Sequence, residues 1–221
     1  MSTDLTPTAL RRLAVPDGRH HLEADLTLPE GATGLVLLAH LPGAGRSRHP
    51  LVAEVLHDAG IATLHFPLLT DAEALIRANS FDLELLADRV AAATNAVARL
   101  PECAPLPLGY LGDGTGAGAA LVAAASLGRR VRAVVARGGR PDLAGPWLHQ
   151  VKAATLLVVG GLDTPVLGLN HLALEQLEGH KRLTVVPGAS HFFEEPGTLE
   201  QAMRLARDWF QHHLHLPAAV H

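Results

Sequence analysis

Apolar residues recur at two different spacings along this chain, and each spacing predicts a different kind of element. Residues 35–39 form a continuous apolar run, which is typical of a strand buried on both faces. Residues 22–28 alternate apolar and polar positions, as a half-buried antiparallel strand does. Residues 81–100 instead carry apolar side chains at helical spacing and stop before Pro101.

The same patterns place further elements along the rest of the chain. Short apolar runs predict strands at residues 61–66, 106–111, 131–136, 155–159 and 183–186. Longer segments predict helices at residues 47–59, 114–127, 167–177 and 199–214. Strands that alternate with helices imply βαβ units. We therefore predict an α/β fold in which a mostly parallel central sheet carries helices on both faces.

Length and composition fit one domain. The chain has 221 residues, so we predict a single domain over residues 1–221, with residues 1–20 as an N-terminal extension and 214–221 as a C-terminal tail. The formal net charge is −4 and no basic stripe is present, which argues against nucleic acid as a partner. No apolar run reaches membrane-spanning length and no apolar signal core is present, which predicts a cytoplasmic protein without membrane contact. The sequence gives no indication of oligomeric state.

Metal and cofactor sites are not predicted. Cys103 is the single cysteine, and none of the 14 histidines falls in a credible zinc motif. The histidine-rich run at residues 211–215 is interpreted as the polar end of a helix. Residues 114–119 match the glycine spacing of a dinucleotide fingerprint, but the motif lies in the middle of the chain and the next strand ends without an acidic residue.

Catalytic and binding residues are expected in the loops that follow the strands, because open parallel sheets place their functional sites at the carboxyl ends of the strands. The loop at residues 112–116 has the small-x-nucleophile-x-small frame of a nucleophile elbow, yet its centre is Gly114. Asp163 and His191 follow two later strands, which gives the chain order nucleophile, acid, histidine. Glycine removes the alcohol that would form an acyl-enzyme.

Four motifs resemble those of the bacterial dienelactone-hydrolase-like group of α/β-hydrolases. Gly-Asp-Gly-Thr-Gly-Ala at residues 112–117 stands where such proteins often have Gly-Ala-Ser-Thr-Gly-Ala. Residues 137–145 read Arg-Gly-Gly-Arg-Pro-Asp-Leu-Ala-Gly, and residues 160–163 form the Gly-Gly-x-Asp acid loop. The ending Pro-Gly-Ala-x-His…Phe-Glu-Glu-Pro occupies residues 187–196. The resemblance implies an α/β-hydrolase fold over about residues 20–213, with Asp163 and His191 as triad members.

The chain departs from that group at the ends of its strands. Leu41 and Pro42 stand where the relatives have the Gly-Ser of His-Gly-Ser-Gly, and Pro67 stands where they usually have aspartate. Gly114 replaces serine, and Leu162 replaces a residue that is frequently basic. Because these changes cluster where the pocket is expected, we interpret them as a pocket altered as a unit, by natural divergence or by engineering.

Each candidate residue has an expected role. His191 is the general base, oriented by Asp163, and the backbone N–H groups of Leu41 and Thr115 are the expected oxyanion donors. Asp113 is either a second acid or base that faces the pocket or a charge that stabilises the helix start. His40 is expected to brace the oxyanion loop, and the Thr115 hydroxyl to cap the helix. The remaining expected pocket residues are Pro42, Pro67, Leu111, Leu162 and Trp147, together with His65.

Three functions remain open from the sequence. The leading hypothesis is cofactor-independent proton-transfer chemistry on a small apolar substrate, such as isomerisation, epimerisation, elimination, cyclisation or a lyase reaction, with His191 as the base. The first alternative is a serine ester or lactone hydrolase represented by an inactive Ser-to-Gly variant. The second is a non-catalytic protein that binds ligands in the old pocket. Slow hydrolysis by water that His191 activates is a further possibility.

Overall fold

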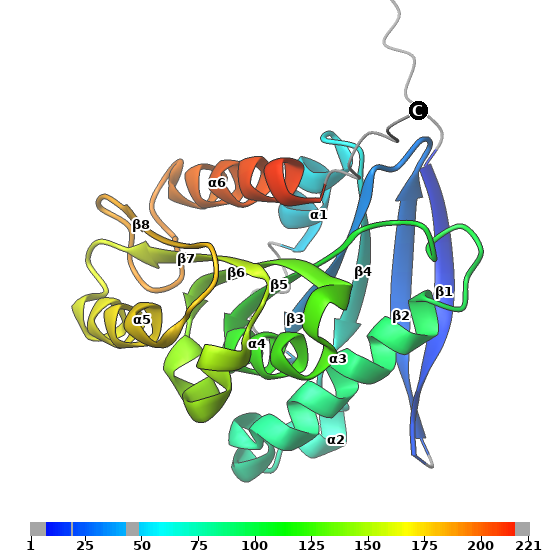
Figure 1. Cartoon of the computed structure of the whole chain (residues 1–221), viewed down its shortest axis with the longest axis horizontal. Helices are drawn as coiled ribbons and strands as arrows, with labels where there is room; N and C mark the ends of the chain where they lie inside the picture. Colours follow the sequence, from blue (N-terminus) through cyan, green and yellow to red (C-terminus); the bar gives the residue numbers. More distant parts are fainter. Residues whose placement is uncertain (1–7, 19, 43–48, 215–221) are drawn as a thin grey trace, which may run out of the picture.

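The computed structural model describes residues 8–18, 20–42 and 49–214, and its centre is one twisted eight-stranded sheet (Figure 1). In spatial order the strands are β1 (Thr8–Asp17), β2 (His20–Pro29), β4 (Ile61–Pro67), β3 (Gly34–His40), β5 (Leu108–Gly114), β6 (Val131–Gly139), β7 (Ala154–Gly160) and β8 (Lys181–Val186). β2 pairs antiparallel with β1 and with β4, and the other strand pairs are parallel. The predicted mostly parallel sheet is confirmed.

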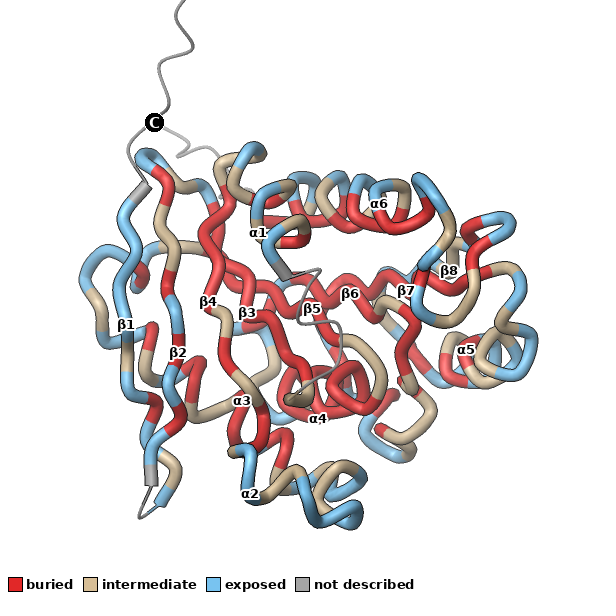
Figure 2. The backbone as a smooth tube through the Cα atoms, turned by 180° about the vertical axis from the view of Figure 1, so that it is seen from behind, coloured by how far each residue is buried: buried red, intermediate tan, exposed pale blue. Residues whose placement is uncertain are grey.

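Helices cover both faces of the sheet, as predicted. α1 (His49–His57) and α6 (Thr198–His213) lie on one face, whereas α2 (Asp71–Ala74), α3 (Leu83–Val97), α4 (Thr115–Leu127) and α5 (Thr164–Gln176) lie on the other (Figure 1). Each face has its own buried apolar cluster, and the central strands are buried on both sides (Figure 2). None of the described helices combines the length and apolar character that a membrane span requires.

Most predicted elements agree with the structure to within a few residues. The helix expected over residues 81–100 begins at Leu83, because the Asp82 carboxylate caps it by accepting the N–H of Leu85 at 3.0 Å. The helix expected from residue 47 is described from His49 onward, and residues 43–48 lie outside the described part of the chain.

The sequence patterns did not predict β1, which lies within the segment expected to be an N-terminal extension. Its two adjacent arginines and Pro16 resemble a polar segment rather than a strand. β1 is the outermost strand, largely exposed in Figure 2, and Val15 is its one fully buried apolar residue in the described range. Edge strands commonly carry charges and proline, because one side of their backbone has no ladder to form.

A buried arginine ties this edge of the molecule together. The Arg89 side chain on α3 is only 3% exposed. Its guanidinium donates to the Asp17 carboxylate at the end of β1 (3.0 Å), to the Glu73 carboxylate on α2 (2.7 Å) and to the Leu68 carbonyl (2.7 Å). The hydrogen bond from Arg89 is the main reason that the pKa of Glu73 falls to about 2. One side chain thus joins three segments that are distant in sequence.

We expect Arg89→Met to destabilise the fold by about 3 kcal/mol, because it leaves two partly buried carboxylates without their cation. Chemical denaturation of the two chains measures the difference. Arg12→Met is the matched control: Arg12 is 83% exposed and 3.8 Å from Asp25, so its loss should change the free energy of unfolding by less than about 0.5 kcal/mol. Equal effects of the two substitutions would contradict this role of Arg89.

The contribution of Arg89 should also depend on pH. The folded-state pKa of Glu73 lies at about 2, below its ordinary value of 4.5. Its ionised carboxylate therefore stabilises the fold fully above about pH 4.5 and loses that contribution as the pH falls toward 2. The difference in unfolding free energy between the natural chain and Arg89→Met should shrink over this range. A pH-independent difference, measured by urea denaturation at several pH values, would show that Glu73 is not the linked group.

Candidate active site

The turn from β5 into α4 has the geometry expected of an elbow. Gly114 has φ of 53° and ψ of −129°, a backbone conformation that side chains other than glycine rarely adopt. A Cβ atom at Gly112 would lie 2.6 Å from Ala117 Cα, and one at Gly116 would lie 2.4 Å from the Ala39 carbonyl oxygen. At Gly114, by contrast, a Cβ would meet no described atom within 4 Å. Packing therefore demands glycine on both sides of position 114 but not at its centre.

Asp163 and His191 form the predicted hydrogen-bonded pair. The two side chains lie at 2.6 Å, Nδ1 of the imidazole to Oδ2 of the carboxylate. The Asp163 side chain is 11% exposed and the His191 side chain 37% exposed. Because a carboxylate accepts, Nδ1 carries the proton, and Nε2 has no hydrogen-bond partner among the described residues. The imidazole is thus held in the tautomer that a general base requires.

Close backbone contacts bring the two loops of this pair together. A Cβ at Gly160, the last residue of β7, would lie 2.4 Å from the carbonyl oxygens of both Ala189 and Ser190. The N–H of Leu162 donates to the Ala189 carbonyl at 2.9 Å. The acid loop at residues 160–163 and the loop that contains His191, here called the histidine loop, are therefore packed backbone against backbone.

Two consecutive glycines at the end of β6 join the histidine loop to the elbow. A Cβ at Gly138 would lie 2.9 Å from the His191 carbonyl oxygen. A Cβ at Gly139 would lie 3.6 Å from the Gly114 carbonyl oxygen, and the Gly114 carbonyl also accepts the N–H of Arg140 at 2.8 Å. The elbow and His191 thus flank the same dipeptide, which assembles one site from the ends of four strands.

The loop of His191 contains a strained residue that sequence reasoning missed. Among the described residues, Phe193 is the one non-glycine residue with a positive φ, at 53°. Its ring is buried against Gly138, and its N–H donates to the Ser190 carbonyl at 3.2 Å. The Glu195 carboxylate accepts the N–H of Ser190 at 2.9 Å, and this bond lowers the pKa of Glu195. Such strain persists where the surrounding packing fixes the backbone, and it is frequent at functional sites.

Asp113 has a partner that the sequence did not predict. Its two carboxylate oxygens accept from Arg137 at 3.0 and 2.5 Å, and the Arg137 side chain is 10% exposed. The pairing follows from the sheet register, which places Asp113 on β5 beside Arg137 on β6. Because both oxygens are occupied by a guanidinium, the contacts favour a structural role over an acid facing the pocket.

The structure describes part of the oxyanion loop, residues 40–45 at the end of β3. His40 is buried, its Nδ1–H donates to the Leu38 carbonyl at 3.1 Å, and its ring stacks on His65 with centroids 4.3 Å apart. Pro67 lies beside His40 in the sheet register, and Leu41 is half-buried against the apolar cluster of the α3–α4 face. Pro42 is half-buried, and Gly43–Gly45 of this loop lie outside the described residues.

Three other residues do not have the site roles that the sequence predicted for them. Leu111 is 3% exposed in the core beneath α1 and α6, so it is a core residue rather than an open pocket wall. Trp147 lines a cavity of about 300 Å³ together with Leu83 and Val122, about two turns along α4 from the elbow. The predicted cap by Thr115 is wrong, because Gly114 is the N-cap and the buried Thr115 hydroxyl has no hydrogen-bond partner in the described structure.

Leu162 remains at the site, next to Asp163, with 65% of its surface exposed. Phe192 is 60% exposed, and its ring meets the His191 imidazole edge-on with centroids 4.6 Å apart. Apolar surface therefore borders the Asp163–His191 pair. Across the described residues, no three histidine, cysteine or acidic side chains are placed to bind a metal.

Comparisons with known proteins agree with this architecture. The structure superposes on a dienelactone hydrolase from Anabaena variabilis ATCC 29413 with a TM-score of 0.88 and 48% identity, covering 94% of this chain and 99% of that one. A dienelactone hydrolase-like promiscuous phosphotriesterase from metagenomic libraries shares the fold at 17% identity, with a TM-score of 0.77 and coverage of 93% and 98%. No family model matches the chain.

A curated relative shows higher identity over part of its length. The "Putative phosphoribosyl transferase" of Mycobacterium tuberculosis strain H37Rv is 58% identical over 193 residues, which are 86% of this chain and 43% of that protein. The chain therefore spans less than half the length of the curated relatives that it matches. Because 48% identity extends over nearly the whole dienelactone hydrolase chain, this protein belongs to the dienelactone hydrolase-like family of the α/β-hydrolase fold.

Proposed function

We propose that this protein is an acid–base enzyme on a hydrolase scaffold, in which Gly114 occupies the nucleophile position and His191 acts as the general base. The observation that carries the proposal is the 2.6 Å hydrogen bond between His191 and Asp163, next to an elbow whose centre has no side chain. A base that has no serine to activate is available to take a proton directly from a substrate.

The proposed step is removal of a proton from a carbon next to a carbonyl group. The C–H bond breaks and its proton moves to His191 Nε2. Its electron pair forms a double bond to the carbonyl carbon, and the π pair of the carbonyl group moves onto the oxygen. Asp163 stabilises the imidazolium that forms. Return of the proton to either face gives epimerisation, return to another carbon gives isomerisation, and loss of a neighbouring leaving group gives elimination.

The developing oxyanion needs donors. The N–H of Thr115 lies in the first turn of α4, where backbone N–H groups have no partner within the helix and the helix dipole favours negative charge. The N–H of Leu41 at the end of β3 is the proposed second donor. The exposed apolar surfaces of Leu162 and Phe192 suit a small apolar substrate. Asp113 has no part in the mechanism, because Arg137 engages both of its carboxylate oxygens.

One observation favours a second candidate, a serine hydrolase that has lost its nucleophile. A Cβ at position 114 would meet no described atom within 4 Å, so no described contact excludes a side chain there.

We expect the protein to exchange acidic C–H hydrogens of small esters and lactones for deuterium in D2O, as followed by NMR. His191→Ala should slow the exchange by about 100-fold or more, because it removes the base. His171→Ala is the matched control, since His171 lies exposed on α5, away from the site. Exchange by His191→Ala at the natural rate would refute the proposed mechanism.

Gly114→Ser should form an acyl-enzyme with an activated ester and release about one equivalent of p-nitrophenol in a burst, whereas the natural chain and Gly114→Ala should not. The Ala variant controls for backbone strain at φ 53°, which costs about 1–3 kcal/mol and is measured by thermal unfolding. If a folded Gly114→Ser chain shows no burst, position 114 is not the nucleophile position. If it turns over esters while the natural chain exchanges no C–H hydrogen, the serine-hydrolase candidate is correct.

A further inference from the structure

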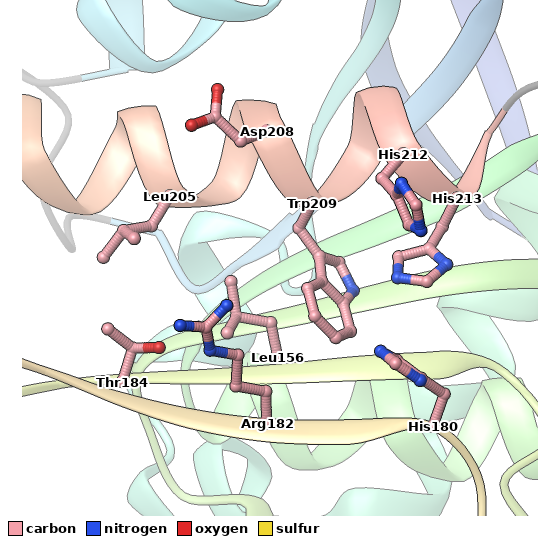
Figure 3. Close-up of a pocket in the computed structure, with 9 residues that line it drawn as sticks. All are labelled: Leu156, His180, Arg182, Thr184, Leu205, Asp208, Trp209, His212 and His213. Carbon is pink, nitrogen blue, oxygen red and sulfur yellow. The ribbon is translucent and has the colours of Figure 1, made fainter.

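A cavity lies near the amino ends of β7 and β8, whereas His191 follows the carboxyl end of β8. It measures about 320 Å³, between the first half of β8 and the second half of α6 (Figure 3). Asp163 and His191 follow the carboxyl ends of β7 and β8, whereas this cavity is lined from the amino end of β8, by His180, Arg182 and Thr184. We call it the β8–α6 pocket. Its volume is at the lower end of the range for small-molecule sites.

Some polar groups that line this pocket have no partner in the described part of the chain. The Thr184 Oγ1 and His213 Nε2 atoms are buried, and neither has a hydrogen-bond partner in the described structure. Arg182 has no ion pair with any described carboxylate, and its guanidinium lies beside the Thr184 hydroxyl in Figure 3. Buried polar atoms without partners cost free energy, so such atoms usually mark a place where water or a ligand is bound. Two of them line this single pocket.

Apart from Asp208, the rest of the lining is apolar or aromatic. Leu156 and Leu205 line the pocket with Trp209, whose indole N–H donates to the Ala154 carbonyl at 3.1 Å and is thereby fixed. The His180 and His213 rings pack against Trp209, with centroids at 5.2 and 4.4 Å. A ligand here would meet a cation and a hydroxyl at one end, apolar surface in the middle and imidazoles at the other end (Figure 3).

The charges that face the pocket favour an anion. Burial, with the neighbouring His212 and His180, lowers the pKa of His213 to about 4, so its imidazole is neutral at pH 7. Asp208 is the one acidic residue in the described lining, and it forms a hydrogen-bonded ion pair with Arg207 at 2.7 Å. The unpaired positive charge therefore comes from Arg182.

We propose that the β8–α6 pocket is a second binding site, specific for a small organic carboxylate with an apolar or aromatic body. The carboxylate accepts hydrogen bonds from the Arg182 guanidinium and the Thr184 hydroxyl, which hold it at one end. The body of the ligand lies over Trp209 and the two leucines. His213 Nε2 is then the hydrogen-bonding group at the far end.

Calorimetric titration of the full chain with benzoate tests the proposal. Arg182→Gln should weaken binding about tenfold or more, and Thr184→Val, which keeps the shape of the side chain, should weaken it several-fold. Arg204→Gln is the matched control, because Arg204 is exposed on α6, the helix beside the pocket, and does not line the pocket. Acetate and benzamide should each bind at least about tenfold more weakly than benzoate, since one lacks the body and the other the charge.

The outcomes separate this site from the catalytic proposal. His191→Ala should leave benzoate binding unchanged even though it slows hydrogen exchange by about 100-fold or more. If His191→Ala abolishes benzoate binding and Arg182→Gln does not, benzoate binds at the elbow and the second site is refuted. Absence of benzoate binding, or equal binding of acetate, would also overturn the proposal, because the unpartnered atoms would then hold only water or any small anion. Thermal unfolding confirms that each variant is folded.

Discussion

The contact between the start of α4 and the sheet is the constraint on which the rest of the site depends. Gly116 lies directly against the Ala39 carbonyl of β3, at a distance that leaves no room for a Cβ, and Gly112 lies against the backbone of Ala117. Packing this close brings the first turn of α4 to the carboxyl edge of the strands. It also forces the chain to reverse at Gly114, which explains the positive φ there. The helix N-terminus, and with it the N–H of Thr115, is positioned by the same contact.

The same principle extends to the other loops. Gly160 meets the carbonyl groups of the histidine loop, and Gly138 and Gly139 lie between that loop and the elbow. Each of these glycines lies where the backbone of a neighbouring loop approaches. The position of each loop is therefore fixed by contact with the next one. A Cβ at Gly114 would meet no described atom within 4 Å, so these backbone contacts do not depend on a side chain at position 114. This is why an intact pair of Asp163 and His191 next to Gly114 is compatible with chemistry that uses the base alone.

The sequence predicted those parts of the molecule that depend on local patterns. The buried strands were predicted from continuous apolar runs, and the elbow and the pairing of Asp163 with His191 followed from loops at strand ends in the expected order. What could not be predicted depends on contacts between distant segments. Predicting the Asp113–Arg137 pair requires the register of β5 against β6. Predicting β1 requires the contact between its last residue, Asp17, and Arg89 on α3. Leu111 was assigned to the pocket because the apolar run at residues 106–111 does not show which residues are enclosed by the helices on each face of the sheet.

The two proposed sites are linked by the connectivity of the chain. β8 and α6 are consecutive elements, and the loop between them contains His191, Phe193 and Glu195. A ligand in the β8–α6 pocket would contact Arg182 and Thr184 on one of these elements and Trp209 on the other, and so hold the two together at the end distant from the loop. The strained backbone at Phe193 means that the loop geometry is set by the packing of its surroundings. If a ligand in the pocket changes that packing, it changes the affinity of the His191 site for substrate by some factor. Thermodynamic linkage then requires that substrate at the His191 site changes the affinity of the pocket for its ligand by the same factor.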